Sequence, residues 1–134
     1  MEILVRQRLN RPVAPHLSIY QPQITWTLSA LNRITGSVLS GGLYIFGLTY
    51  LAAPLFGWSI TSAAMAAGFA KWGFLTKVAA KSALAWPFVF HCVNGVRHLI
   101  WDAGRQITNV QVIRTGWAVV GLSVVGTLGL VFFV

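Results

Sequence analysis

The sequence is poor in charged residues, and poorest in acidic ones. Of its 134 residues, 9% are charged, and the only two acids are Glu2 and Asp102. Soluble domains carry roughly a quarter charged residues, so this chain has too few to cover a surface in water. The single cysteine, Cys92, excludes an internal disulfide framework, and its apolar neighbours predict a buried packing residue. The composition excludes a soluble enzyme and a disordered tail.

Hydrophobic residues make up 56% of the chain, which also contains six tryptophans and thirteen glycines. These features are typical of membrane proteins, in which glycine lets helices approach and tryptophan lies at the membrane interface. The net charge is +8, but the basic residues are scattered between apolar runs and form no patch. We therefore expect the chain to lie in a lipid bilayer and to bind no nucleic acid.

Gaps in the charge pattern predict where the chain crosses the membrane. Three stretches contain no Asp, Glu, Lys or Arg: 34–70, 82–96 and 115–134. A bilayer span needs about 20 mostly apolar residues. The sequence therefore predicts an all-α integral membrane protein with three transmembrane helices. From these gaps we place the helices at about 30–56, 80–104 and 112–134.

The segments around these spans differ in character. Prolines at positions 12, 15 and 22 cannot all lie in one straight helix, so residues 1–28 are expected to form an ordered arm with a short helix. Pro54 and Gly57 mark the end of the first span. The following residues, 58–70, are expected to form a connecting loop or surface segment. The whole chain, 1–134, is expected to be one membrane-anchor domain.

Basic residues predict the orientation of the spans. With three spans, the N-terminus and the second loop share one side of the membrane. That side has six basic residues, against three on the other, which are Lys71, Lys77 and Lys81. By the positive-inside rule, the N-terminus lies in the matrix or cytoplasm and the C-terminus on the opposite side.

The second span carries polar groups that cost free energy to place inside a membrane: His91, Asn94, Arg97 and His98. His91 and His98 share a helix face about 10 Å apart, with Gly95 on the same stripe leaving room for a flat ring. His91 is a candidate axial haem ligand. The two histidines cannot bind one iron, so a second ligand would come from a partner chain. The alternative is that each histidine makes only a helix–helix hydrogen bond.

A second candidate site lies at the membrane boundary. Trp26, Ser29 and Arg33 share one helix face by their spacing. A hydroxyl, a guanidinium and a flat indole suit a quinone headgroup, and Arg33 could alternatively pair with a haem propionate. The simpler alternative is an interfacial Trp beside a snorkelling Arg. Asp102 is expected to pair with Arg105, with a proton-relay role as the weaker alternative.

Three stretches resemble a known family: RPVAPHLSIYQ at 11–21, SALNRITG at 29–36 and HCVNGVRHLIWDAG at 91–104. They are similar to the cytochrome b large membrane-anchor subunits of succinate dehydrogenase, respiratory complex II. The start of the arm, EILVRQRLNRP, looks most like fungal mitochondrial members. One departure is Asn32, where many members have His.

The resemblance implies a multi-pass protein of the mitochondrial inner membrane, or of the cytoplasmic membrane if bacterial. It implies a small membrane-anchor subunit, an iron–sulfur subunit and a flavoprotein subunit as partners. The chain is not catalytic alone and contributes to the ubiquinone site of the complex. By the resemblance, His91 is the axial ligand of a haem b shared with the small anchor, and Ser29, Arg33 and Trp26 line the quinone site. Residues expected near the haem propionates or a proton path are Arg33, Arg97, His98 and Asp102.

Other functions stay open from the residues alone. The main alternative is a structural transmembrane subunit of another respiratory complex, without haem. A di-haem cytochrome b would need more histidines at paired depths than this chain has. A small transporter is a weaker alternative, because no inverted repeat is visible.

Overall fold

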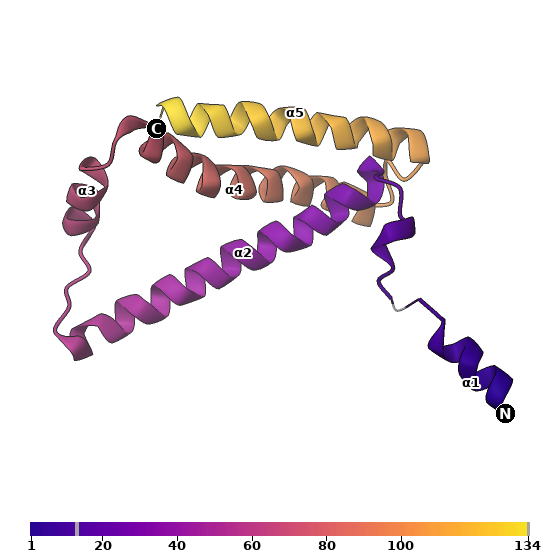
Figure 1. Cartoon of the computed structure of the whole chain (residues 1–134). Coiled ribbons are helices and arrows are strands. Elements are labelled where there is room, and N and C mark those ends of the chain that lie inside the picture. Colours follow the sequence, from indigo (N-terminus) through magenta and orange to yellow (C-terminus); the bar gives the residue numbers. More distant parts are fainter. Residues whose placement is uncertain (13, 134) are drawn as a thin grey trace.

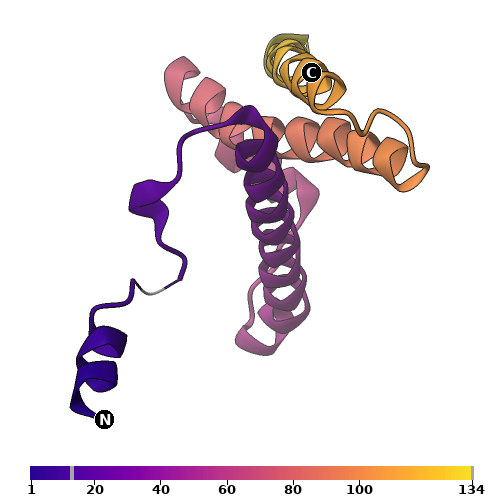
Figure 2. The ribbon, with the colours of Figure 1, turned by 90° about the vertical axis from the view of Figure 1, so that its right-hand side faces the viewer.

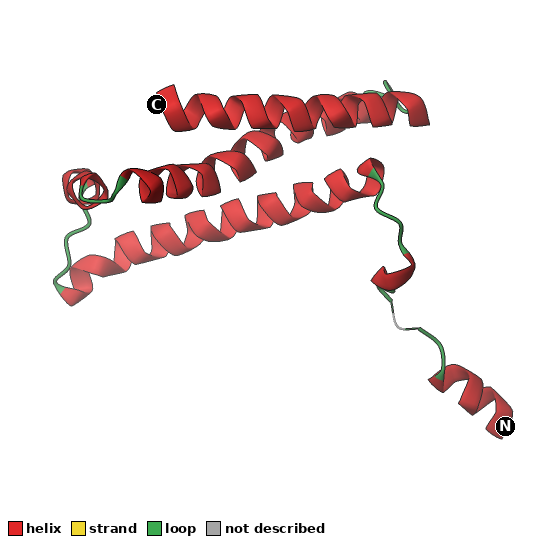
Figure 3. Cartoon of the chain, turned by 45° about the horizontal axis from the view of Figure 1, so that its top comes forward, coloured by secondary structure: helices red, strands yellow, loops and turns green. Residues whose placement is uncertain are grey.

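The computed structural model describes residues 1–12 and 14–133, and these residues form helices joined by short connections (Figure 1). The α-helices are α1 (Glu2–Leu9), α2 (Ile24–Ala52), α3 (Ser62–Ala70), α4 (Phe74–Asp102) and α5 (Asn109–Phe133). Within the described residues there is no β-strand (Figure 3), so the all-α prediction is confirmed. The predicted arm and the predicted third span each include one residue outside this description, Val13 and Val134.

Two helices of the described chain are long and apolar enough to cross a membrane. They are Ile24–Phe56, which is α2 with the 3-10 turn that follows it, and Asn109–Phe133, which is α5. Helix α4 has 29 residues and is therefore roughly 43 Å long. Because of its polar residues, it is not among the helices apolar enough to be identified as a span by composition. The length of α4 allows a third span, and the three-span topology stays a prediction.

The end of α2 is where Pro54 and Gly57 predict it. After Ala52 the chain makes a 3-10 turn, Ala53–Phe56, that contains Pro54. Gly57 then adopts the left-handed conformation, with φ of +73°, which glycine accepts without a side-chain clash. The turn and this glycine together stop the helix.

The expected loop over 58–70 is only partly right. Its second half is helix α3, which begins after Thr61, whose side chain accepts a hydrogen bond from the Ala64 backbone N–H at 3.2 Å. Alanine-rich sequence behind a threonine cap favours a helix, and this local preference outweighed the weak apolar pattern. No residue of α3 is buried, so the surface position is as expected.

Helices α4 and α5 lie antiparallel, side by side, and the N-terminal half of α2 packs against both (Figure 1). The small core between them consists of Leu28, Phe90 and Val119. Both buried residues of α2, Leu28 and Thr35, belong to its N-terminal half. Farther along, α2 diverges from α4, while the arm projects away from the three helices (Figures 1 and 2).

The inner face of α4 is defined by its three buried residues, Phe90, Asn94 and Arg97. Their spacing of four and three residues places them on one side of the helix. Cys92 lies on the other side and is exposed. The prediction that Cys92 is buried was therefore wrong, because an apolar run in a membrane helix does not show which of its faces meets protein.

Candidate functional site

His91 faces α2 and is held there by the backbone of that helix. Its Nδ1 lies 3.0 Å from the carbonyl oxygen of Asn32 and 3.4 Å from the Thr35 hydroxyl. A carbonyl oxygen can only accept, so Nδ1 carries the proton. The lone pair of the ring is then on Nε2, which makes no hydrogen bond with any described residue. This is the arrangement in which a histidine presents Nε2 to a metal ion.

Gly36 makes the approach of His91 possible. A Cβ at position 36 would lie 2.6 Å from His91 Cε1 and 3.2 Å from His91 Nδ1, so any side chain there would displace the ring. The sequence pattern had pointed instead to Gly95. A Cβ at Gly95 would meet nothing within 4 Å, so no part of this chain requires glycine at that position.

Ser29 and Arg33 lie beside the His91 contact. On α2, Asn32 follows Ser29 by three residues and Gly36 follows it by seven. The three residues therefore form one stripe of that helix. Ser29 is half-buried and Arg33 is exposed, and neither side chain makes a hydrogen bond or ion pair with the described residues. Both polar groups are therefore available to an external molecule next to His91.

Trp26, the third residue of this face, is fixed by the arm. Its indole Nε1–H donates to the Gln21 carbonyl oxygen at 2.9 Å, and its ring meets Tyr20 edge-on at a centroid distance of 5.9 Å. The indole N–H is therefore already used. What remains for a ligand is the flat face of a ring that is 39% exposed.

The end of α4 carries His98 and Asp102. The His98 ring stacks on Trp101 at a centroid distance of 4.9 Å. His98 Nε2 and Trp101 Nε1 are buried and have no hydrogen-bond partner among the described residues, whereas Asp102 is exposed.

The predicted pair between Asp102 and Arg105 does not form. The one ion pair among the described residues joins Glu2 and Arg6, at 3.6 Å. Helix α4 ends at Asp102, and Gly104, with φ of +71°, turns the chain before Arg105. The pair was predicted from helical spacing, which does not hold beyond the end of the helix.

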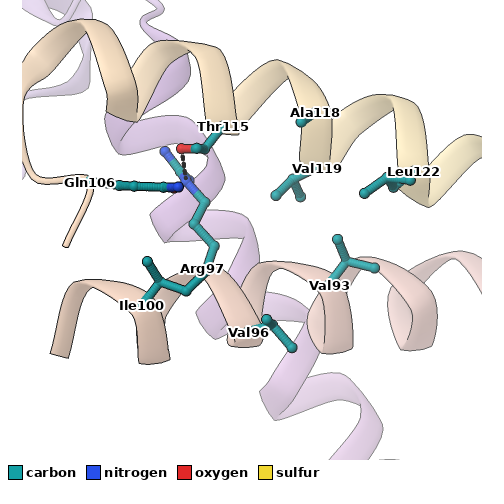
Figure 4. A pocket seen from close by; sticks show the side chains of 9 residues that line it. All are labelled: Val93, Val96, Arg97, Ile100, Gln106, Thr115, Ala118, Val119 and Leu122. Atoms are coloured by element: carbon teal, nitrogen blue, oxygen red, sulfur yellow. Dashed lines mark hydrogen bonds between the residues drawn. The ribbon is translucent and has the colours of Figure 1, made fainter. Parts of the chain in front are cut away.

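Arg97 points away from His91, toward α5. It lies with Thr115 and Gln106 at one end of an apolar cavity of about 360 Å³ between α4 and α5 (Figure 4). The sequence identifies Asn94 and Arg97 as polar groups that are costly inside a membrane, but it does not reveal their partners on α2 and α5. The contacts of Gly36, Asn94 and Thr115 each join two different helices, and no pattern within one helix marks them.

Comparison with known proteins places the chain in a family. Residues 7–130 match the succinate dehydrogenase/fumarate reductase transmembrane subunit family. The chain is 48% identical over 121 residues to the mitochondrial succinate dehydrogenase cytochrome B subunit of Schizosaccharomyces pombe, covering 90% of this chain and 67% of that protein. It is 38% identical to the mitochondrial succinate dehydrogenase cytochrome b560 subunit of Caenorhabditis briggsae, covering 97% and 70%. The chain belongs to this family.

The family assignment confirms the resemblance drawn from the three sequence motifs, including its fungal mitochondrial character. A further relative is the mitochondrial inner membrane protein SHH3 of Saccharomyces cerevisiae, 41% identical over 131 residues, with 94% of this chain and 65% of that protein covered. The chain thus spans about two thirds of the length of these relatives.

Proposed function

We propose that this chain is the cytochrome b subunit that anchors succinate dehydrogenase in the mitochondrial inner membrane. The family match, the mitochondrial relatives and the two strongly apolar helices support this function. In this role the chain is not catalytic alone. It holds the flavoprotein and iron–sulfur subunits on the membrane, pairs with a small anchor subunit, and contributes to the sites of haem b and ubiquinone.

The observation that carries the proposal is the geometry of His91. Its Nδ1 is bonded to a backbone carbonyl oxygen, which leaves Nε2 as a free ligand nitrogen on a half-buried ring. Gly36 provides the space that the ring needs. These residues fit a haem, and His91 would hold it as an axial ligand. When bound, haem b supplies a one-electron redox centre.

A second axial ligand would come from the partner anchor. The chain has three histidines, and besides His91 they are His16 in the arm and His98 two turns farther along the same helix. That separation along one helix is too large for His91 and His98 to hold one iron. A haem would therefore be held jointly by this chain and the small anchor subunit.

Ser29 and Arg33 would bind the ubiquinone headgroup. Arg33 donates to a quinone carbonyl oxygen and stabilises the negative charge that develops there on reduction. The Ser29 hydroxyl donates a second hydrogen bond that orients the ring, and the exposed face of Trp26 forms a flat wall. Because Ser29 shares a helix stripe with the residues that contact His91, the quinone and haem sites are neighbours. His98 and Asp102 are proposed as neighbours of the haem propionates or a proton path.

We also propose that α2, α4 and α5 all cross the membrane. The start of α2, the end of α4 and the start of α5 lie at one end of the structure, together with the arm (Figure 1). The arginines of the arm and of the α4–α5 connection gather at that end, and the lysines at 71, 77 and 81 lie toward the other. By the positive-inside rule, the arm faces the matrix.

The quinone site is tested by Arg33→Ala in the assembled complex. Removing the charged donor is expected to lower the succinate–ubiquinone rate by roughly a hundredfold or more, while succinate oxidation by a soluble dye is unchanged. Arg105→Ala, which removes an exposed arginine outside the site, is the matched control and should leave both rates unchanged. An Arg33→Ala complex with normal ubiquinone reduction would contradict the assignment.

A further inference from the structure

Two side chains of α4 join all three long helices at one level. Asn94 and Arg97 are 0% and 3% exposed. The Asn94 Nδ2 donates to the Leu28 carbonyl oxygen of α2 at 3.2 Å, and its Oδ1 accepts from Arg97 Nη1, also at 3.2 Å. The single amide of Asn94 therefore connects α2 to the guanidinium of Arg97.

Arg97 continues the connection to α5. Its Nε donates to the Thr115 hydroxyl at 3.0 Å, as drawn in Figure 4, and its Nη2 donates to the Val112 carbonyl oxygen at 2.7 Å. The guanidinium also lies 4.2 Å from the centre of the Trp101 ring. Gly116 lies beside this group and packs closely against α2, because a Cβ there would lie 3.2 Å from Ile24 Cγ1 and 3.3 Å from Leu28 Cδ1.

The guanidinium is buried without a carboxylate partner in this chain. The only acids are Glu2, in the arm, and Asp102, which is exposed and forms no ion pair among the described residues. Burying a charge is costly, and a well-packed apolar pair would often stabilise a fold more. The directed hydrogen bonds of Arg97 and Asn94 instead determine how far, and in what register, the helices lie from one another.

The residues of this network are close in sequence to those of the two proposed sites. Asn94 lies three residues after His91 on α4, and its acceptor on α2, Leu28, directly precedes Ser29. We infer that Asn94 and Arg97 are positioning residues, which hold His91 and Ser29 at the separation that the haem and quinone sites require. The inference rests on the proposed function, and it gives these two residues no direct contact with either ligand.

The test is Asn94→Asp in the assembled complex. The aspartate keeps an oxygen for Arg97, and the adjacent guanidinium keeps it ionised, but an acceptor now faces the Leu28 carbonyl oxygen. Only the connection to α2 is broken. The KM for ubiquinone is expected to rise roughly tenfold with a smaller change in kcat, and the reduced haem band to shift, while dye-linked succinate oxidation is unchanged. Cys92→Ser, on the exposed face of the same helix, should change neither KM nor spectrum.

The outcomes separate a positioning role from a purely structural one. An Asn94→Asp complex with the KM and haem spectrum of the original protein would overturn the inference, even if less complex were recovered. If the Asn94→Asp complex fails to assemble, Thr115→Val is the deciding test. This variant removes one hydrogen-bond acceptor of Arg97 and keeps the hydrogen bond between Asn94 and the Leu28 carbonyl oxygen. A raised ubiquinone KM in that variant supports the inference, and an unchanged KM overturns it. An unsubstituted complex with neither haem nor ubiquinone reduction would overturn the proposed function, and this inference with it.

Discussion

At the scale of single residues, the orientation of His91 depends on the backbone of another helix. Asn32 supplies a carbonyl oxygen and Gly36 supplies space, and both belong to α2. A rotation of the ring away from α2 would break the hydrogen bond between Nδ1 and the Asn32 carbonyl oxygen. Asn32 and Gly36, one turn apart on α2, thus determine where Nε2 points.

Gly36→Ala is expected to weaken haem binding. The new Cβ would lie 2.6 Å from His91 Cε1 and would push the ring off the Asn32 carbonyl oxygen. Loss of such a supporting hydrogen bond lowers the affinity of a metal ligand by roughly tenfold or more. The measurement is the haem content of the purified complex. Gly47→Ala in the same helix, where a Cβ meets nothing within 4 Å, should retain normal haem content, and equal content in both variants would contradict the geometry.

Asn32→Ala is expected to leave haem binding intact. His91 is bonded to the backbone of position 32, which every residue provides. The Asn32 side chain has a buried Oδ1 with no partner among the described residues, and removal of an unpaired buried polar atom is close to neutral for stability. The presence of Asn at position 32, where many family members have His, therefore does not affect the hydrogen bond that orients His91. A haem spectrum changed as much as in Gly36→Ala would disprove this.

Local spacing predicted some of these residues and could not predict others. Ser29 and Arg33 are one turn apart, so their common face follows from the sequence. The contact between Gly36 and His91 joins two helices across more than fifty residues, and no periodicity within either helix reveals it. The same is true of Asn94, whose acceptor on α2 is a backbone carbonyl oxygen that any residue could supply.

At the scale of helices, the absence of charged residues predicted the apolar helices α2 and α5 more directly than the more polar helix α4. The uncharged stretches at 34–70 and 115–134 led to α2 and α5. Helix α4 was expected only because its short uncharged stretch could be extended through Arg97 and His98. In the structure Arg97 is buried, 3% exposed, and its guanidinium faces α5. If α4 crosses the membrane as we propose, its charge is thereby kept away from lipid.

The packing of α4 against α5 depends on a close contact at Gly126. A Cβ at this position would lie 2.8 Å from Val89 Cγ1 of α4, and valine has little freedom to move aside. Gly126→Ala is therefore expected to destabilise the helix pair by about 1–3 kcal/mol relative to Gly129→Ala, where a Cβ meets nothing within 4 Å. Melting temperatures of the two detergent-solubilised complexes provide the comparison. Equal values would mean that α4 and α5 do not pack this closely.

At the scale of the whole molecule, the chain buries little of its own surface. Large apolar residues of the diverging half of α2 are strongly exposed, among them Leu43, Tyr44 and Leu51, at 70%, 72% and 73%. Such a surface is unfavourable in water and natural in a bilayer or against other subunits. A single membrane-anchor domain over 1–134 remains our prediction for this arrangement.

The most direct test of this account is a reduced-minus-oxidised visible spectrum of the purified complex, with and without His91→Ala. The original complex is expected to show a low-spin b-type band at about one haem per copy of the chain, because His91 and a second ligand from the small anchor would hold the iron. In His91→Ala that band should be lost or rearranged, while the flavoprotein and iron–sulfur subunits stay attached. An unaltered low-spin band in His91→Ala would contradict the assignment of His91 as the axial ligand.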